Sequence, residues 1–497
     1  MFNRRASGVL VHPTSFPSSY GMGDLGAGAY AFVDFLKAAR QKLWQVLPLG
    51  PTGFGDSPYQ SFSSFAGNHY LISPDELRNE GWLTDNDLSN IPGSNPRYID
   101  YGSVIGYKMG LFRKAFDKFK ATATATQKTR VTKFCNKNKD WLDDYSMFTA
   151  LKHHFGGKEW HKWPTDLAHR KSGALEEMRI KLSDSVEFCK FLQYEFFRQW
   201  GNLKEYANSA GVKIIGDIPI FVAHDSADVW ANPELYHLDA KGQPTEVAGV
   251  PPDYFSATGQ LWGNPLYNWD AHKKTEYDWW CRRVAAVLAM VDIVRIDHFR
   301  GFESYWAIPF GEETAVNGKW LKGPGKPLFT ALKNKLGELP IIAEDLGEIT
   351  DKVDKLRVGA GLPGMRVLHF AFTPGVNSNY LPHNFGDYLT VVYSGTHDNN
   401  TTLGWYQEAP ESERDYMRRY LNVSGDDVSW DLIRLAISTN ALYSIIPIQD
   451  IMNLPAADRM NKPGDSQGWW RFRYTQEMLD YNYASRLAYL TALFHRD

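Results

Sequence analysis

Short apolar segments recur along the chain and have the length and composition of buried parallel strands. In order, these eight segments are residues 7–13, 43–50, 212–221, 291–299, 339–347, 365–372, 389–400 and 442–451. Stretches with the spacing of amphipathic helices lie between them, among them residues 29–41, 187–211, 278–291, 327–337 and 430–441. Gly211 and Gly337 stand directly before two of the strands, where helix C-caps belong.

Strands that alternate with helices indicate a parallel sheet. Eight of them predict an α/β fold in which the sheet closes into a (β/α)8 TIM barrel, with functional groups at the C-terminal ends of the strands. A doubly wound open sheet is the alternative, and it usually carries a G-x-G-x-x-G phosphate loop after its first strand. We expect no such loop in residues 11–26, "VHPTSFPSSYGMGDLG", and therefore favour the barrel.

The long connections predict how the chain is divided. We expect one catalytic barrel over residues 1–497, with a mostly helical subdomain inserted at 75–186 after the second strand. A further insertion, residues 222–270, is expected after the third strand, and smaller ones from the fifth strand onward.

Composition and charge exclude several classes of protein. The 497 residues are 43% hydrophobic and 22% charged, as in a globular chain with a large core. No apolar run approaches the roughly 20 residues of a membrane-spanning helix, and Pro13 and Pro17 make the N-terminus a poor secretory signal. Lysine plus arginine (54) nearly balances aspartate plus glutamate (57), so we expect no nucleic-acid or membrane partner. Three widely spaced cysteines form neither a disulfide framework nor a zinc motif, which indicates a cytoplasmic location.

Polar groups follow four of the predicted strands at the point where each strand ends. These groups are Asp217, Asp297, the pair Glu344 and Asp345, and the pair His397 and Asp398. A single aspartate in such a place is more often a helix cap or part of a structural ion pair. Because the parallel strands of a barrel end at the same rim, four of these groups together predict a functional site there.

The surroundings of Asp297 and Glu344 predict different protonation states for the two carboxyls. Side chains alternate along a strand, so Arg295 and Asp297 share a face and form an ion pair that lowers the pKa of Asp297. Glu344 follows the apolar residues "PIIA", and desolvation there raises its pKa. An ionised carboxylate suits a nucleophile, and a protonated one suits a general acid. Two such groups about 5–5.5 Å apart cleave glycosidic bonds with retention of configuration.

Other residues bear on this hypothesis. Asp398 and His397 are placed to bind sugar hydroxyls, and Asp398 to help distort the sugar ring. Aromatic residues make up 14% of the chain, and we expect a minority of them to line a groove for sugar rings. A Mg²⁺ site of the enolase type is an alternative for clustered carboxylates at a barrel mouth, and treatment with EDTA discriminates between the two.

Six motifs, which together cover nearly the whole chain, resemble those of the 4-α-glucanotransferase (amylomaltase or disproportionating enzyme) family of the α-amylase superfamily. They are "GPTGFGDSPYQSFSSFAGN", "GDIPIFV", "DYFSATGQLWGNPLYNW", "VRIDHFRGF", "IIAEDLG" and "SGTHDNNT". The resemblance implies that Asp297 is the nucleophile, Glu344 the acid/base and Asp398 a third carboxylate that stabilises the transition state.

The same resemblance implies a set of substrate-binding residues. The donor side of the cleaved bond is matched by Tyr59, Asp217, Arg295 and His397, and further site positions by Ser57 and His298. The acceptor side is matched by Gln260 and Trp262, and a flexible flap over the glucan by the loop 246–259. A second, remote glucan site is matched by Tyr101 and by Phe54, which replaces a tyrosine that is frequent in the family.

This resemblance predicts a retaining transferase that needs no cofactor or metal ion. It implies that the enzyme moves α-1,4-glucan segments between maltooligosaccharides or amylose chains through a glycosyl intermediate on Asp297. An α-glucan hydrolase with the same carboxylates is the nearest alternative. A non-catalytic glucan-binding protein is an alternative of a different class.

Overall fold

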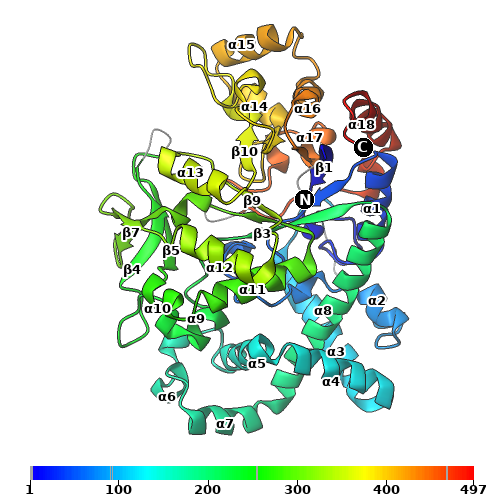
Figure 1. Ribbon diagram of the computed structural model, residues 1–497. Helices are drawn as coiled ribbons and strands as arrows, with labels where there is room; N and C mark the ends of the chain where they lie inside the picture. Colours follow the sequence, from blue (N-terminus) through cyan, green and yellow to red (C-terminus); the bar gives the residue numbers. More distant parts are fainter. Residues whose placement is uncertain (1–3, 90, 92, 94, 253–255, 466–467) are drawn as a thin grey trace.

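At the centre of the protein, eight parallel strands form a barrel (Figure 1). The computed structural model describes residues 4–497 except 90, 92, 94, 253–255, 466–467 and the side chain of Phe54. The strands are β1 (Ala6–Leu10), β2 (Leu43–Gln45), β3 (Lys213–Ile218), β6 (Ile293–Ile296), β9 (Ile341–Ala343), β10 (Gly364–Val367), β11 (Thr390–Tyr393) and β12 (Tyr443–Pro447). Each overlaps one of the eight predicted segments, so the strands and the barrel fold are confirmed.

The barrel is nearly closed, with β9 and β10 as its last two neighbours. The Ala343 N–H donates to the Pro363 carbonyl at 2.9 Å. The Met365 N–H donates to the Asp345 carboxylate at 2.6 Å, in place of a backbone acceptor on β9. A Cβ on Gly364 would lie 2.4 Å from that carboxylate, so only glycine allows this approach. Asp345, one of the acids at the strand ends, therefore stabilises the contact between β9 and β10.

Helices follow seven of the eight barrel strands. They are α1 (Ala27–Ala38), α8 (Ser183–Ser209), α11 (Asp278–Met290), α12 (Lys326–Leu336), α13 (Asp351–Gly359), α16 (Val428–Ser438) and α18 (Tyr481–Leu493). After β10 the chain forms only short 3-10 helices in residues 368–389, all of which are described. The predicted caps are confirmed, because Gly211 and Gly337 have left-handed φ angles of 79° and 80°. Among the described residues, no helix combines the length and apolar character needed to cross a membrane.

The connection from β2 to β3 forms a group of helices on one side of the barrel (Figure 1). They are α2 (Pro74–Asn79), α3 (Tyr101–Thr122), α4 (Ala125–Lys137), α5 (Lys139–His154), α6 (Thr165–Ala168) and α7 (Ser172–Lys181), which leads into α8. The inserted region is helical, as predicted, and its division from the barrel as a subdomain of residues 75–186 stays a prediction.

A second sheet of four antiparallel strands lies beside the barrel, in the order β5-β4-β7-β8 (Figure 1). Its strands are β4 (Glu246–Val250), β5 (Gln260–Pro265), β7 (Ser304–Pro309) and β8 (Lys319–Lys322). The first two belong to the predicted insertion 222–270, whereas β7 and β8 follow β6 in an insertion that the sequence did not predict. The predicted flap, 246–259, contains β4 and the loop to β5, and its residues 253–255 lie outside the described residues. Further α-helices of the described residues are α9 (Ala227–Ala231), α10 (Trp269–Lys274), α14 (Thr402–Glu408), α15 (Glu411–Leu421) and α17 (Ile448–Ile451).

Residues 21–26, "GMGDLG", do have the G-x-G-x-x-G spacing, so the expectation that residues 11–26 lack it is wrong. The loop is nevertheless not built for a phosphate. Gly26 is the N-cap of α1, and its N–H donates to the Asp24 carboxylate at 2.9 Å. An acidic side chain of the chain itself thus occupies the helix N-terminus where a phosphate binds in doubly wound folds.

Candidate active site

Arg295 lies between two carboxylates at the C-terminal ends of the strands. Its guanidinium donates to Asp217 at 2.6 Å and to Asp297 at 2.9 Å. The register explains this contact, because Asp217 on β3 is the direct partner of Arg295 on β6, and Asp297 follows on the same face. The predicted ion pair of Arg295 and Asp297 is confirmed, and Asp217 is a second partner of the guanidinium.

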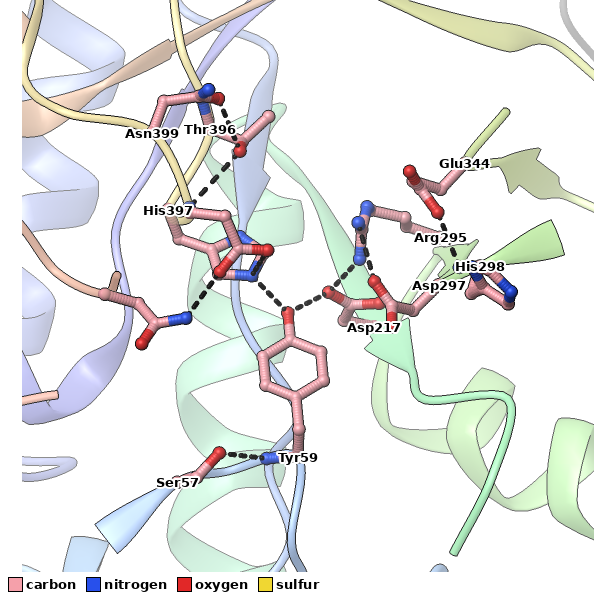
Figure 2. A network of polar contacts seen from close by, with 12 residues as sticks. Ser57, Tyr59, Asp217, Arg295, Asp297, His298, Glu344, Thr396, His397 and Asn399 are labelled. Carbon is pink, nitrogen blue, oxygen red and sulfur yellow. Dashed lines mark hydrogen bonds and ion pairs between the residues drawn. The ribbon is translucent and has the colours of Figure 1, made fainter. Parts of the chain in front are cut away.

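Glu344 lies at the same level as Asp297. The register of β6 and β9 aligns the last residues of these strands, so Asp297 and Glu344, which follow directly, end neighbouring strands side by side. The His298 N–H donates to Glu344 Oε2 at 2.6 Å. His298 adopts a left-handed conformation (φ 50°, ψ 50°), which turns the chain sharply after Asp297. Figure 2 shows Glu344, His298 and Asp297 grouped around Arg295.

Burial raises the pKa of both carboxyls, of Asp297 to about 7 and of Glu344 to about 8. The expectation for Glu344 is therefore confirmed. The expectation that Arg295 holds the pKa of Asp297 below its usual value is wrong, because burial outweighs the guanidinium and the charge of Asp217 opposes it. The side chain of Asp297 is 27% exposed, so its carboxylate is accessible to a ligand.

Tyr59 connects these charges to His397. Its hydroxyl donates to Asp217 Oδ2 at 2.7 Å and lies 2.8 Å from His397 Nε2. The rings of Tyr59 and His397 also stack, with centroids 5.3 Å apart and an angle of 10° between their planes. Burial lowers the pKa of His397, which keeps the imidazole neutral. Figure 2 shows Tyr59 between His397 and Asp217, so three predicted donor-side residues form one network.

Asp398 is held by residues that the sequence did not predict. The Asn461 amide donates to Asp398 Oδ1 at 2.6 Å, and Arg459 donates to the Asp398 backbone carbonyl at 2.6 Å. Nearby, the ring of Trp470 lies 5.7 Å from that of Tyr59. These three residues come from an irregular segment before α18, which has no strand or helix periodicity to reveal it. The side chain of Asp398 is 39% exposed, so it is accessible to a ligand.

The two predicted acceptor-side residues lie on β5, next to His298. The Trp262 indole N–H donates to Gln260 Oε1 at 3.1 Å. The Trp262 ring meets the His298 ring edge-on, with centroids 4.9 Å apart. Burial lowers the pKa of His298 to about 3, so this ring is neutral. The structure thus brings Trp262 and Gln260 to the residue that follows Asp297.

The remaining predicted residues lie in the loop after β2 and at the start of α3. Ser57 Oγ accepts a hydrogen bond from the Tyr59 N–H at 3.2 Å and so supports this loop. Phe54 begins a 3-10 turn, and its side chain lies outside the described part of the protein. Tyr101 is buried, and its hydroxyl donates to the Trp470 carbonyl at 2.9 Å. The structure does not bring Tyr101 to the carboxylates, and its glucan-binding role stays a prediction.

The described residues include no group of three or more His, Cys, Asp or Glu side chains arranged to hold a metal ion. In the site itself, the Arg295 guanidinium lies between the Asp217 and Asp297 carboxylates and repels a second cation. This geometry favours glycoside chemistry over the Mg²⁺ alternative.

Comparison with known proteins agrees with the site. A profile of the 4-alpha-glucanotransferase family matches residues 11–479. The chain is 49% identical to the 4-alpha-glucanotransferase of Synechocystis sp. over 500 residues, or 100% of this chain and 99% of that protein. It is 48% identical to the 4-alpha-glucanotransferase of Thermus thermophilus over 490 residues, or 97% of each chain. The amylomaltase from Streptococcus agalactiae in complex with acarbose has a TM-score of 0.96 and 42% identity, covering 99% of this chain and 100% of that chain. The chain therefore belongs to the 4-alpha-glucanotransferase family.

Proposed function

We propose that this chain transfers α-1,4-glucan segments from one maltooligosaccharide or amylose chain to the 4-hydroxyl of another glucan, by a retaining double displacement. The observation that carries the proposal is the pair Asp297 and Glu344 at adjacent strand ends, the first beside a guanidinium and the second after an apolar strand. Membership of the family, and the similarity to an amylomaltase solved with acarbose, support α-glucans as substrates.

In the first step, a carboxylate oxygen of Asp297 attacks the anomeric carbon, and the bond from this carbon to the glycosidic oxygen breaks. Glu344 gives its proton to the leaving oxygen, so the reducing-end fragment departs as an alcohol and Glu344 becomes a carboxylate. A pKa of about 8 keeps Glu344 protonated at neutral pH for this task. The exposed carboxylate of Asp398 stabilises the positive charge that develops on the sugar ring.

In the second step, Glu344 acts as a base. Esterified Asp297 carries no charge, so the repulsion by which Asp297 raises the pKa of Glu344 disappears. Glu344 then takes the proton of an acceptor 4-hydroxyl, whose oxygen attacks the anomeric carbon and releases the Asp297 carboxylate. The bond formed is equivalent to the bond broken, so the products are a distribution of chain lengths and no cofactor takes part.

The residues on β5 support transfer to a sugar over transfer to water. Trp262 presents an aromatic ring beside His298, and such a surface binds the apolar face of an acceptor sugar. A bound acceptor gains the advantage of position over a passing water molecule. The flap, 246–259, would add to this by excluding water from the intermediate.

We further propose that the enzyme works in the cytoplasm, in the metabolism of starch, glycogen or their oligosaccharides. Its cysteines, Cys135, Cys189 and Cys281, are free thiols, as is usual in a reducing compartment.

The products formed from maltotriose test the proposal. A transferase produces glucose together with oligomers longer than maltotriose, whereas the hydrolase alternative produces only glucose and maltose. Accumulation of glucose and maltose alone would therefore overturn it. EDTA is expected to leave the rate unchanged, and a loss restored by Mg²⁺ would favour the enolase-type alternative.

The variant Asp297→Asn tests the nucleophile. We expect turnover to fall by at least about a thousandfold, because the amide cannot form the glycosyl ester. Binding of maltooligosaccharides, measured by calorimetry, should persist because the side chain keeps its shape. Unchanged turnover would show that another residue is the nucleophile. A wild-type protein that binds these glucans without turnover would favour the non-catalytic alternative.

A further inference from the structure

A small cavity adjoins His397 at the C-terminal ends of β1 and β12. Residues after β1, among them His12 and Ser15, line it together with His397 and mostly apolar side chains. His12 has an extended backbone (φ −88°, ψ 144°), so it continues the alternation of β1 and points into the barrel with Leu10. The cavity leaves room for about one water molecule.

Three polar atoms on the residues that line this cavity are buried without a hydrogen-bond partner. They are Nδ1 of His12, Oγ of Ser15 and Nδ1 of His397. Buried polar atoms in folded proteins are almost always paired, either directly or through an ordered water that has two to four polar partners. The cavity therefore offers a water-sized space among the residues that carry these three atoms.

The positions of the protons on Tyr59 and His397 determine whether His397 Nδ1 donates a hydrogen bond to such a water or accepts one from it. Tyr59 has one hydroxyl proton, and it points to Asp217. The contact between the tyrosine oxygen and His397 Nε2, 2.8 Å long, is therefore a hydrogen bond in which Nε2–H is the donor. A neutral imidazole that is protonated at Nε2 has a bare Nδ1, which can only accept.

We propose that an ordered water in this cavity accepts a hydrogen bond from His12 Nδ1–H and donates one to His397 Nδ1, with Ser15 Oγ accepting its second hydrogen. His12 is thereby a positioning residue, which holds His397 in the Nε2–H form without touching the substrate. The proposal deepens the proposed function, because it concerns the donor side of the same site.

The consequence of losing this water follows from the same proton count. If His397 carries its proton on Nδ1, the bare Nε2 competes with Asp217 for the single proton of Tyr59. The hydrogen bond from Tyr59 to Asp217 is then only partly populated, and the donor-side side chains lose their fixed arrangement. His12 therefore affects sugar binding through two intermediates, the water and His397.

The variant His12→Leu tests this, with the histidine tautomers read from the ¹⁵N spectrum of protein labelled at histidine. In the wild type we expect His397 as the neutral Nε2–H form. In His12→Leu we expect a mixture of both tautomers and a loss of roughly tenfold in kcat/KM for maltotriose. The variant His12→Asn, whose amide Nδ2–H takes the position of Nδ1–H and can donate to the same water, should recover part of both.

A matched control is His272, which is buried as deeply as His12 but lies outside the site. His272→Leu should lower the melting temperature to a similar extent and leave the His397 signal unchanged. An Nδ1–H form of His397 in the wild type would overturn the proposal, and this measurement needs no variant to fold. A His12→Leu variant with unchanged tautomer and kcat/KM would overturn it as well. Since the spectrum is recorded without substrate, it separates failure of this proposal from failure of the proposed function.

Discussion

The guanidinium of Arg295 donates hydrogen bonds to two carboxylates, Asp217 at the end of β3 and Asp297 after β6. Arg295 lowers the pKa of Asp297, whereas the neighbouring charge of Asp217 raises it, and burial has a larger effect than either. Burial, followed by the negative charge of Asp297, raises the pKa of Glu344 to about 8. Burial thus raises the pKa of both reacting carboxyls toward neutrality, and catalysis uses the form in which Glu344 carries the proton.

The pH dependence of kcat/KM should be bell-shaped. The active form has an ionised Asp297 and a protonated Glu344. Activity falls as the pH drops through about 7, where Asp297 gains a proton, and as it rises through about 8, where Glu344 loses its proton. Initial rates of maltotriose disproportionation measure both limbs, and a rate that does not change through this range would contradict the assignment.

The variant Asp217→Asn should move the acid limb of this profile to lower pH. The amide removes the negative charge of Asp217, which raises the pKa of Asp297. Asp297 is then the one remaining charged partner of Arg295 among the two carboxylates. Its oxygen still accepts from Tyr59, so the network keeps its shape. As a control, Asp225→Asn, which removes an acid paired with Lys152, should leave both limbs in place. A shift of the acid limb to higher pH would contradict the electrostatic argument.

The alternation of side chains predicts which residues of a strand contact each other, but it does not predict how these contacts shift a pKa. The alternation of side chains was enough to pair Arg295 with Asp297. The sign of the pKa shift depended on Asp217, which a neighbouring strand brings in from 78 residues earlier, and on the depth of burial. His12 could have been identified by the same rule as Asp217, because it is a polar residue at the end of the predicted strand 7–13. Asn461 could not, since its segment has no periodicity.

At the scale of elements, burial decides which strands can be predicted. The eight barrel strands are apolar runs that are buried on both faces, and all of them were predicted. The strands of the second sheet were not predicted. They pair within insertions, and β5, β7 and β8 are partly exposed. The helix expected after β10 is absent from residues 368–389, and nothing in the pattern of neighbouring elements signals its loss.

The antiparallel sheet provides a test of how the enzyme chooses its acceptor. Trp262→Ala removes the aromatic surface beside His298, so we expect the KM for an acceptor such as glucose to rise roughly fivefold to tenfold. Water then competes better for the intermediate, and the ratio of hydrolysis to transfer should rise with it. The gain in reducing ends, compared with the glucose released from maltotriose, measures this ratio, because only hydrolysis adds reducing ends.

The control for this variant lies in the same sheet. Trp320 on β8 is 39% exposed and pairs with Trp306 on β7. Trp320→Ala should leave the KM for glucose and the ratio of hydrolysis to transfer unchanged. An equal effect of both variants would mean that the sheet acts through its stability, and not through an acceptor site on β5.

At the scale of the whole molecule, the barrel is closed by residues from distant parts of the chain. Arg496 lies at the N-terminal ends of the strands. Its side chain is fully buried and donates to backbone carbonyls and to the Thr439 hydroxyl. Its partners include the carbonyls of Ala6 at 3.1 Å, Ile437 at 2.6 Å and Thr439 at 2.9 Å. These atoms belong to β1 and to the C-terminal end of α16, so the Arg496 side chain connects both regions to the last residues of the chain.

Replacing Arg496 with methionine should therefore destabilise the protein as a whole and leave the site chemistry intact. The carbonyls at the end of α16 carry partial negative charge. Without the guanidinium, the Ile437 carbonyl loses its side-chain partner, whereas the Thr439 carbonyl keeps a hydrogen bond from Arg5. We expect a loss of about 2–4 kcal/mol in the free energy of unfolding, seen as a lower melting temperature. Arg419→Met is the matched control, because its side chain is 74% exposed and its pair with Asp415 should contribute less than ~1 kcal/mol. At a temperature where both variants are folded, kcat/KM should equal that of the wild type. A large loss of activity in folded Arg496→Met would show instead that the two ends of the barrel are coupled, since this side chain lies at the opposite end of the strands from Asp297 and Glu344.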